Sequence, residues 1–239
     1  MNGAAQSPDR VRAALEAAVT AAGLVARGVI RVTPEDALGD IVPGRPIVSV
    51  LLVGWRGRAG WAAFAASGER RDGAADPLDR WSRRVIGEIA AAQGGRALFP
   101  FEGPPWWPFQ RWGMRGEGLT PSPLGLAIDA QVGLWHGWRG AIAVGDDLGA
   151  EAATQVSPCA SCGPRSCLVA CPADAFTGSG FEVGRCRGFL ESHAGGLCRT
   201  DGCRARDACP VGRAHRYAPD QIRFLMAAYR ASLPETDPT

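Results

Sequence analysis

The chain has 239 residues, which is long enough to bury a hydrophobic core in one large domain or in two smaller ones. Apolar residues make up 46% and charged residues 21%, as in ordinary globular proteins, and the formal net charge of +2 argues against a nucleic-acid binder. No apolar run reaches the roughly 18 residues of a membrane span, and the polar start of the chain lacks the apolar segment of an export signal. We therefore expect a cytoplasmic protein without a membrane-spanning helix.

The first part of the chain predicts helices around a buried strand. Ser7-Pro8-Asp9 is a good helix start, because it combines a capping hydroxyl, an early proline and an acid in the first turn. This helix should end near Gly23. Residues 47–53 form a near-continuous apolar run, as in a buried strand, and residues 34–46 before them are expected to be a loop. A short helix is expected at residues 61–66.

Asp76-Pro77 begins a second long helix, which should run to about Gln93. Its apolar side chains fall on one stripe, as the helical period requires: Leu78, Trp81, Val85, Ile89 and Ala92. A short strand is expected at residues 97–101. The order helix, strand, helix, strand indicates an α+β or α/β layered fold.

Residues 99–112 are rich in prolines and aromatic residues, and the prolines exclude a regular helix. This stretch either closes a hydrophobic core as a rigid loop or forms the wall of a pocket for a flat ligand, since aromatic rings stack on planar groups. Two further strands are expected at residues 122–128 and 140–144. Between them lies a lone histidine, His136, and such a residue is more often structural than a ligand.

All eight cysteines lie between Cys159 and Cys209, after a linker at residues 146–158. They form two groups, C-x2-C-x4-C-x3-C-P and C-x11-C-x4-C-x5-C-P. Bacterial two-cluster ferredoxins use C-x2-C-x2-C-x3-C-P, in which the fourth cysteine binds the other cluster. By this rule, one [4Fe–4S] cluster is held by Cys159, Cys162, Cys167 and Cys209, and the other by Cys171, Cys186, Cys198 and Cys203.

Other uses of the thiols remain open. Zinc sites with four cysteines usually carry C-x2-C knuckles on both sides, and only one C-x2-C is present here. Disulfides need an oxidising compartment, which a chain without an export signal is not expected to reach. One cluster accompanied by structural cysteines is a further possibility.

Arginines and a final helix accompany the cysteines. Positive charge there would offset the charge of a thiolate-bound cluster or dock an acidic redox partner, and it comes from Arg165, Arg185, Arg187, Arg199, Arg204, Arg206, Arg213 and Arg216. A helix begun by proline is expected at residues 219–232, before a polar tail. One side of this helix carries Ile222, Leu225, Met226 and Tyr229.

The layout resembles known redox families. An aromatic-rich α+β domain followed by C-x2-C…C-x3-C-P and a final Cys-Pro resembles epoxyqueuosine reductase and the iron–sulfur half of reductive dehalogenases. Residues 122–140 are similar to a segment of the cobalamin-processing, CblC-type proteins. Short bacterial proteins known only as ferredoxins share Pro-Phe-x-Gly-Pro-Pro, here residues 100–105, and the sequence of residues 208–217.

The resemblance implies a nitroreductase-like N-terminal fold that binds a corrinoid and receives electrons from the clusters. The residues that would line a corrinoid or flavin pocket are Trp106, Trp107, Trp112, Trp135, His136 and Arg139. Epoxyqueuosine reductase has a proton-donating aspartate before a Gly-Pro pair, so the resemblance gives this role to Glu102, which precedes Gly103-Pro104. The chain departs from that family in its shorter length and in the longer spacing before its third cysteine.

We therefore expect an α+β, nitroreductase/CblC-like domain at residues 1–150, a ferredoxin-like module at residues 151–217 and a C-terminal helix and tail at residues 218–239. The function indicated is an iron–sulfur redox protein whose two [4Fe–4S] clusters pass electrons to a corrinoid or flavin/substrate pocket. The sequence leaves open whether the protein is an oxidoreductase or a ferredoxin-type electron carrier, and a zinc-bound interaction module is the third alternative. A redox partner protein is expected, and neither nucleic acid nor membrane.

Overall fold

The structure is a computed structural model that describes residues 8–149 and 155–233. The chain divides into two compact units, which we call unit 1 (residues 1–119 and 136–154) and unit 2 (residues 120–135 and 155–239). The segment of residues 120–135, which the sequence placed in the N-terminal domain, thus belongs to unit 2 with the cysteines. The helix cap expected at Ser7, part of the expected linker and most of the expected tail lie outside the described residues.

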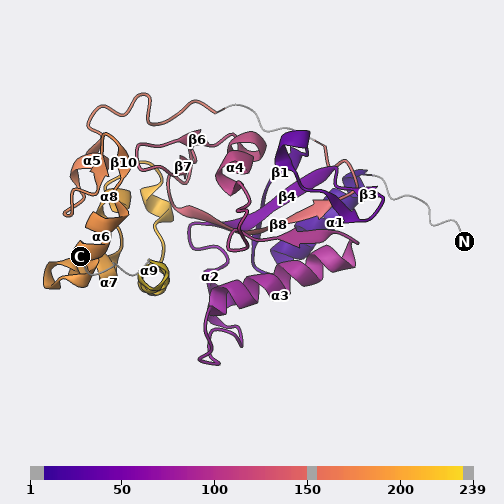
Figure 1. Cartoon of the computed structure of the whole chain (residues 1–239), viewed down its shortest axis with the longest axis horizontal. Helices are drawn as coiled ribbons and strands as arrows, with labels where there is room; N and C mark the ends of the chain where they lie inside the picture. The colour runs from indigo at the N-terminus through magenta and orange to yellow at the C-terminus, as the bar shows by residue number, and fades with distance from the viewer. Residues whose placement is uncertain (1–7, 150–154, 234–239) are drawn as a thin grey trace, which may run out of the picture. The chain divides into compact units, whose positions relative to one another are not determined.

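Unit 1 is built on a four-stranded antiparallel sheet with the order β1-β4-β8-β5 (Figure 1). The strands are β1 (Val25–Arg31), β4 (Ser49–Arg56), β5 (Arg96–Leu98) and β8 (His136–Val144). Strand β4 is central, with Val50 opposite Ala143 and Leu52 opposite Ala141 of β8. The buried strand expected from the apolar run is therefore confirmed, although it begins and ends later than expected.

Helices cover both faces of this sheet. The helices are α1 (Pro8–Ala21), α2 (Trp61–Ala65), α3 (Pro77–Ala92) and α4 (Phe109–Glu117), and a small hairpin of β2 (Asp40–Val42) and β3 (Arg45–Pro46) lies beside the 3-10 turn η1 (Pro34–Asp36). Figure 1 shows α3 on one side of the sheet and α4 on the other. Successive residues of β8 agree with this, because the α-carbon of Gly140 faces Ile86 of α3, whereas Ala141 lies in the core under α4. The mixed α/β architecture is therefore confirmed.

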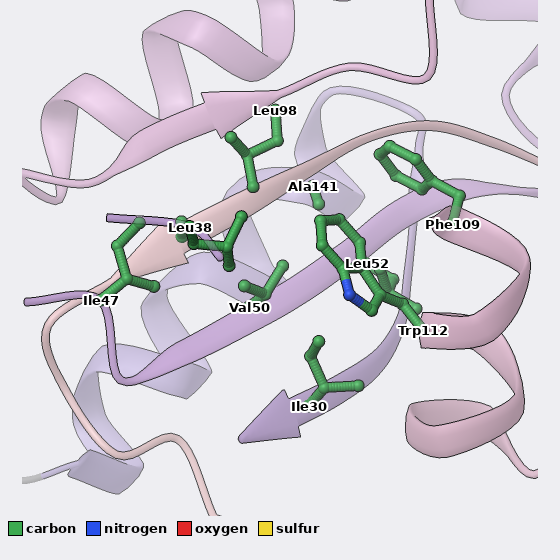
Figure 2. Packing of buried hydrophobic residues seen from close by; sticks show 10 residues of the cluster. Ile30, Leu38, Ile47, Val50, Leu52, Leu98, Phe109, Trp112 and Ala141 are labelled. Atoms are coloured by element: carbon green, nitrogen blue, oxygen red, sulfur yellow. The ribbon is translucent and has the colours of Figure 1, made fainter. Parts of the chain in front are cut away.

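The core between the sheet and α4 contains the aromatic residues of that helix. Figure 2 shows Phe109 and Trp112 projecting from α4 among aliphatic side chains of the strands. Their rings lie 5.2 Å apart at an angle of 58°. The expectation that residues 99–112 exclude a helix was wrong for the last of them, because α4 begins directly after Pro108, and a proline is tolerated before the first helical residue.

Unit 2 consists of short helices joined by turns and two-residue strands. The helices are α5 (Ser166–Val169), α6 (Val183–Glu191), α7 (Gly196–Asp201), α8 (Arg204–Asp207) and α9 (Pro219–Ser232), with 3-10 turns η2 (His193–Gly195) and η3 (Arg213–His215). The strands are β6 (Thr120–Pro121), β7 (Ala127–Ile128), β9 (Phe176–Thr177) and β10 (Gly180–Phe181). The helical turns expected among the cysteines and the final helix are confirmed. The prediction of a strand at residues 122–128 was wrong, because a tight turn between Ser122 and Leu126 separates β6 from β7.

Nowhere in residues 8–149 or 155–233 is a helix both long and apolar enough to cross a lipid bilayer.

A buried carboxylate, Asp36, connects η1 to α4 in unit 1. Its Oδ1 accepts hydrogen bonds from Nε1 of Trp112 at 2.9 Å and from Nη1 of Arg115 at 2.7 Å, and its Oδ2 accepts one from the backbone N–H of Thr33 at 2.9 Å. Burial alone would raise the pKa of Asp36, but these hydrogen bonds outweigh it and hold the pKa below its ordinary value. The ionised carboxylate therefore stabilises the fold of unit 1.

We expect Asp36→Asn to lower the free energy of unfolding by about 1.5–3 kcal/mol near neutral pH, because hydrogen bonds to a charged group are lost. The pKa of Asp36 is lower in the folded than in the unfolded state, so the folded state binds fewer protons. The stabilisation is fully present at pH values above the unfolded-state pKa of an aspartate, about 3.9. It is lost as the pH falls through the lower, folded-state pKa. Urea unfolding at neutral and acid pH measures this, and the difference between wild type and variant should shrink in acid.

Asp147→Asn is the matched control. Asp147 also pairs with an arginine, Arg31, but both side chains are largely exposed. Such a surface pair contributes little to stability because water and salt screen it. Equal losses in the two variants, or a loss for Asp36→Asn that persists unchanged in acid, would contradict the role of Asp36.

Candidate metal centre

All eight thiols are free and lie in unit 2. Cys159 and Cys162 lie in a loop before α5. The others lie on the short helices α5 to α8 or within two residues of them, in the order Cys167, Cys171, Cys186, Cys198, Cys203 and Cys209. Cys171 follows α5 and Cys209 follows α8, and these two helices contact each other. Their packing brings the final cysteine of each sequence group close to the cysteines of the other group.

The cysteines line two different hollows in unit 2. The walls of the first hollow include Cys159, Cys162, Cys167 and Cys209, which we call the first quartet. The walls of the second hollow include Cys171, Cys186, Cys198 and Cys203, the second quartet. The structure thus brings together the same two sets of cysteines that the ferredoxin rule predicts, including the exchange of Cys171 and Cys209.

Burial and the charge of neighbouring thiolates raise the pKa values of several of the thiols. In the first quartet, burial raises the pKa of Cys159 and Cys167, and the charge on Cys209 raises both further. In the second quartet, burial raises the pKa of Cys198 and Cys203, and the charge on neighbouring thiolates of the same quartet adds to it. Ionised thiolates are therefore unfavourable together unless a positively charged metal core compensates them.

Nearby positive groups oppose this repulsion in part. Cys203 precedes α8, and the backbone N–H groups of Ala205 and Arg206 in the first turn of that helix act to lower its pKa. The charges of Arg165 and Arg204 lower the pKa of Cys159 and Cys198, respectively. N–H donors and arginine charges around thiolates are the protein groups that tune a metal–thiolate centre.

The segment of residues 120–135 forms a wall of both hollows. Ile128 lines the first hollow, and Leu124 and Leu126 line the second. Sequence reasoning missed these residues, because the apolar pattern indicated a strand of the N-terminal domain. The only sequence signal for a turn there is Ser122-Pro123 followed by Gly125.

Two glycines hold this segment against the residues after Cys209. Gly133 has a φ of +62° and Gly212 a φ of +70°, both in the left-handed region. A Cβ on Gly212 would lie 2.2 Å from the carbonyl group of Val132, and one on Gly133 would lie 2.2 Å from the carbonyl oxygen of Val211. Only glycine fits at these two positions. The buried side chain of Asp129 caps the loop by accepting the N–H of Val132 at 3.0 Å.

The hollows differ in the room they offer. The second hollow has a volume of about 320 Å³ and mainly apolar walls, which is ample for a four-iron cluster. The first hollow has only about 20 Å³ and so offers much less room. In the part of the chain that the structure describes, no three cysteine, histidine or acidic side chains are arranged to hold a single metal ion. The case for a metal centre therefore rests on the two quartets of free thiols around the hollows.

The tryptophans that were expected to line one common pocket lie in different environments and in both units. Trp112 is fully buried in the core of unit 1, and Trp107 stacks on it with ring centres 6.2 Å apart. Trp106 is 63% exposed. Trp135 lies in unit 2, where its ring meets that of Tyr217 edge-on at 5.3 Å and lies under Arg206.

The polar residues expected in that pocket take part in hydrogen bonds within unit 1. Nδ1 of His136 lies 3.0 Å from Nη1 of Arg27, which can only donate, so the ring proton of a neutral His136 lies on Nε2. Arg27 also pairs with the buried Glu117 at 2.7 Å. Arg139 donates to Asp79 at 2.5 Å and lies between this acid and nearby aromatic rings. Glu102 is partly exposed and lies 3.5 Å from Nε of Arg83.

We expect Gly212→Ala to destabilise unit 2 by more than about 2 kcal/mol and to lower its metal content, because the new methyl group collides with backbone and strains a left-handed φ. Thermal unfolding and metal analysis after anaerobic reconstitution measure both effects. Gly178→Ala is the control, since nothing lies near its added methyl group. A Gly212→Ala protein with wild-type stability and metal content would contradict the close packing of Gly212.

Comparisons with known proteins were made by family, by sequence and by structure. No family model matches the chain, and no curated protein matches it. Epoxyqueuosine reductase from Bacillus subtilis, in a structure with its catalytic aspartate loop swung out of the active site, is similar with a TM-score of 0.50 and 12% identity over 88% of this chain and 68% of that one. A selenomethionine-labelled epoxyqueuosine reductase has a TM-score of 0.49 and 14% identity, over 91% of this chain and 69% of that one. The first of these shows that the chain shares a mixed α/β fold with epoxyqueuosine reductase.

Proposed function

We propose that this chain is an iron–sulfur electron-transfer protein that holds two [4Fe–4S] clusters in unit 2. The observation that carries the proposal is the grouping of eight free thiols into two quartets around two hollows. Four thiolates around each site is the ligand set of a [4Fe–4S] cluster, and the exchange of the last cysteine between groups is the pattern of two-cluster ferredoxins. The fold shared with epoxyqueuosine reductase agrees with this proposal.

In this proposal the chain binds and tunes the clusters. The first quartet holds one cluster and the second quartet the other, and each cluster supplies one-electron transfer. Apolar walls from the segment of residues 120–135 limit the access of water, which sets the dielectric around the thiolates. Arg165 and Arg204 compensate negative charge near Cys159 and Cys198.

We propose further that the N-terminal part, residues 1–150, is a nitroreductase/CblC-like domain and that it is the destination of the electrons. A corrinoid and a flavin are the two candidate acceptors, with Glu102 as the acid that supplies a proton. The module of residues 151–217 then serves as the electron donor to that domain, and the C-terminal helix and tail of residues 218–239 follow it. A separate redox protein in the cytoplasm supplies the electrons.

A second candidate is an electron carrier without a reaction of its own, and two observations favour it. Trp112 fills the core of unit 1 and does not line an open pocket (Figure 2). Arg139 is engaged with Asp79, and His136 with Arg27, so these side chains already have structural partners. In this alternative, unit 1 serves to dock partner proteins.

Two triple variants test which cysteines share a cluster. Both remove Cys159 and Cys162, and they differ only in the third change, Cys209→Ala or Cys171→Ala. With Cys209→Ala, all three changes fall in the first quartet, so the protein should retain about four iron atoms and an intact [4Fe–4S] spectrum. With Cys171→Ala, the second quartet is also damaged, so iron should fall below this value and the spectrum should change. Iron and sulfide analysis and electron paramagnetic resonance after anaerobic purification measure the result.

The reverse outcome, with the intact spectrum in the Cys171→Ala variant, would show that each sequence group holds its own cluster. Wild-type protein that is colourless and contains zinc without sulfide would instead support the zinc-bound interaction module. Either result would contradict the proposed pair of quartets.

Mixing the purified protein with cobalamin, and separately with flavin, tests for an acceptor in unit 1. A bound corrinoid should change its visible spectrum and elute with the protein in gel filtration. Glu102→Gln is the matched variant, since a residue that only supplies a proton should leave binding and iron content unchanged while slowing proton-coupled reduction of the bound group. If neither cobalamin nor flavin binds, the electron carrier is the function that remains.

A further inference from the structure

The final helix, α9, forms a wall of the second hollow. Its side chains Leu225, Met226 and Tyr229 line the hollow together with the second quartet. These positions lie on one face of the helix because they are three or four residues apart. Helix α9 contacts α7, which carries Cys198, and the buried Ile222 packs against Gly202 at the end of α7. The apolar stripe seen in the sequence is thus part of the candidate metal centre.

The hydroxyl of Tyr229 is the one polar group that this face of α9 brings into the hollow. The oxygen is shielded from solvent, and within the described residues it has no well-aligned hydrogen-bond partner. The thiols of Cys186 and Cys203 line the same hollow, and the electrostatic interaction of the hydroxyl is stronger with Cys186 than with Cys203. At neutral pH the phenol keeps its proton, since the ordinary pKa of a tyrosine is about 10.

We infer that Tyr229 is a positioning and tuning residue that donates an O–H···S hydrogen bond to the Cys186 thiolate and thereby raises the reduction potential of the second cluster. This inference rests on the proposed function. A thiolate is a much better acceptor than the thiol, and a buried hydroxyl without another partner gains most from such a bond. The tyrosine oxygen stays protonated, so no bond to it breaks when the cluster takes up one electron.

The direction of the effect follows from charge. Reduction adds one negative charge to the cluster and its thiolates, so a donor aimed at a thiolate stabilises the reduced state more than the oxidised state. The first hollow has no tyrosine among the residues that line it. Tyr229 therefore makes the two clusters inequivalent and favours the electron on the second one.

Tyr229→Phe tests this inference because it removes the hydroxyl and keeps the ring. The measurement is a redox titration with dithionite and mediator dyes, followed by electron paramagnetic resonance. The titration is done in two background variants. In one, Cys159, Cys162 and Cys209 are changed to Ala, so that only the second quartet is intact. In the other, Cys171, Cys186 and Cys198 are changed to Ala, so that only the first quartet is intact. In the chain with the second quartet, the ratio of reduced to oxidised cluster at a fixed potential should fall at least threefold, which corresponds to about 28 mV for a one-electron couple. In the chain with the first quartet, the potential should not move.

Tyr217→Phe is the control, since Tyr217 is the only other tyrosine of the chain, is buried against Trp135 and does not itself line the second hollow. It should leave the potential of the second cluster unchanged. An unchanged potential in Tyr229→Phe overturns the inference, as does an equal shift in Tyr217→Phe or loss of the second cluster. Those results leave the proposed function intact, whereas wild-type protein without iron and sulfide overturns the proposed function itself.

Discussion

The close backbone approach of Gly133 to Gly212 is the constraint on which the arrangement of unit 2 depends. It holds the segment of residues 120–135 against the residues that follow Cys209. Without it, Ile128 would not close the first hollow, nor Leu124 the second. Each hollow thus combines cysteines from the C-terminal third of the chain with apolar walls contributed from before residue 136. A thiolate centre needs both, because sulfur ligands bind the metal and the apolar walls control water and dielectric.

The sequence predicted those features that depend on local chemistry. The long helices were expected because proline starts each of them and an apolar stripe runs along α3 and α9. The two quartets were expected because metal-binding thiols carry characteristic spacings. Strand β1 was missed, since its burial follows no alternation that could be seen in Val25–Arg31. The role of Leu124 and Leu126 in lining the second hollow was missed, because a contact between segments distant in the sequence leaves no local pattern.

The aromatic stretch shows why composition alone does not distinguish a core from a pocket. Trp112 was expected at a ligand, but in the structure its ring lies in the core of unit 1 (Figure 2). Its Nε1 donates to the buried Asp36. A tryptophan supplies a large apolar surface and one donor, and both a core and a pocket use these properties. The buried carboxylate that accepts its N–H lies far away in the sequence, so the sequence could not reveal it. The same holds for Arg139, whose partner Asp79 lies on α3.

The difference between the two hollows has a consequence for how the protein is assembled. The second hollow is open enough to accept a cluster, and α9 side chains, Phe176 and Leu190 line it beside the thiols. The first hollow is much smaller, and burial together with neighbouring thiolate charge raises the pKa of Cys159 and Cys167, so binding of a metal core there is coupled to the loss of their protons. Widening of the first hollow would act on backbone that is tied to Gly133 through Val211 and Gly212, whereas the second hollow already offers room for a cluster. The second quartet should accordingly load first, and loading of the first quartet should be the step that is coupled to the folding of residues 120–135.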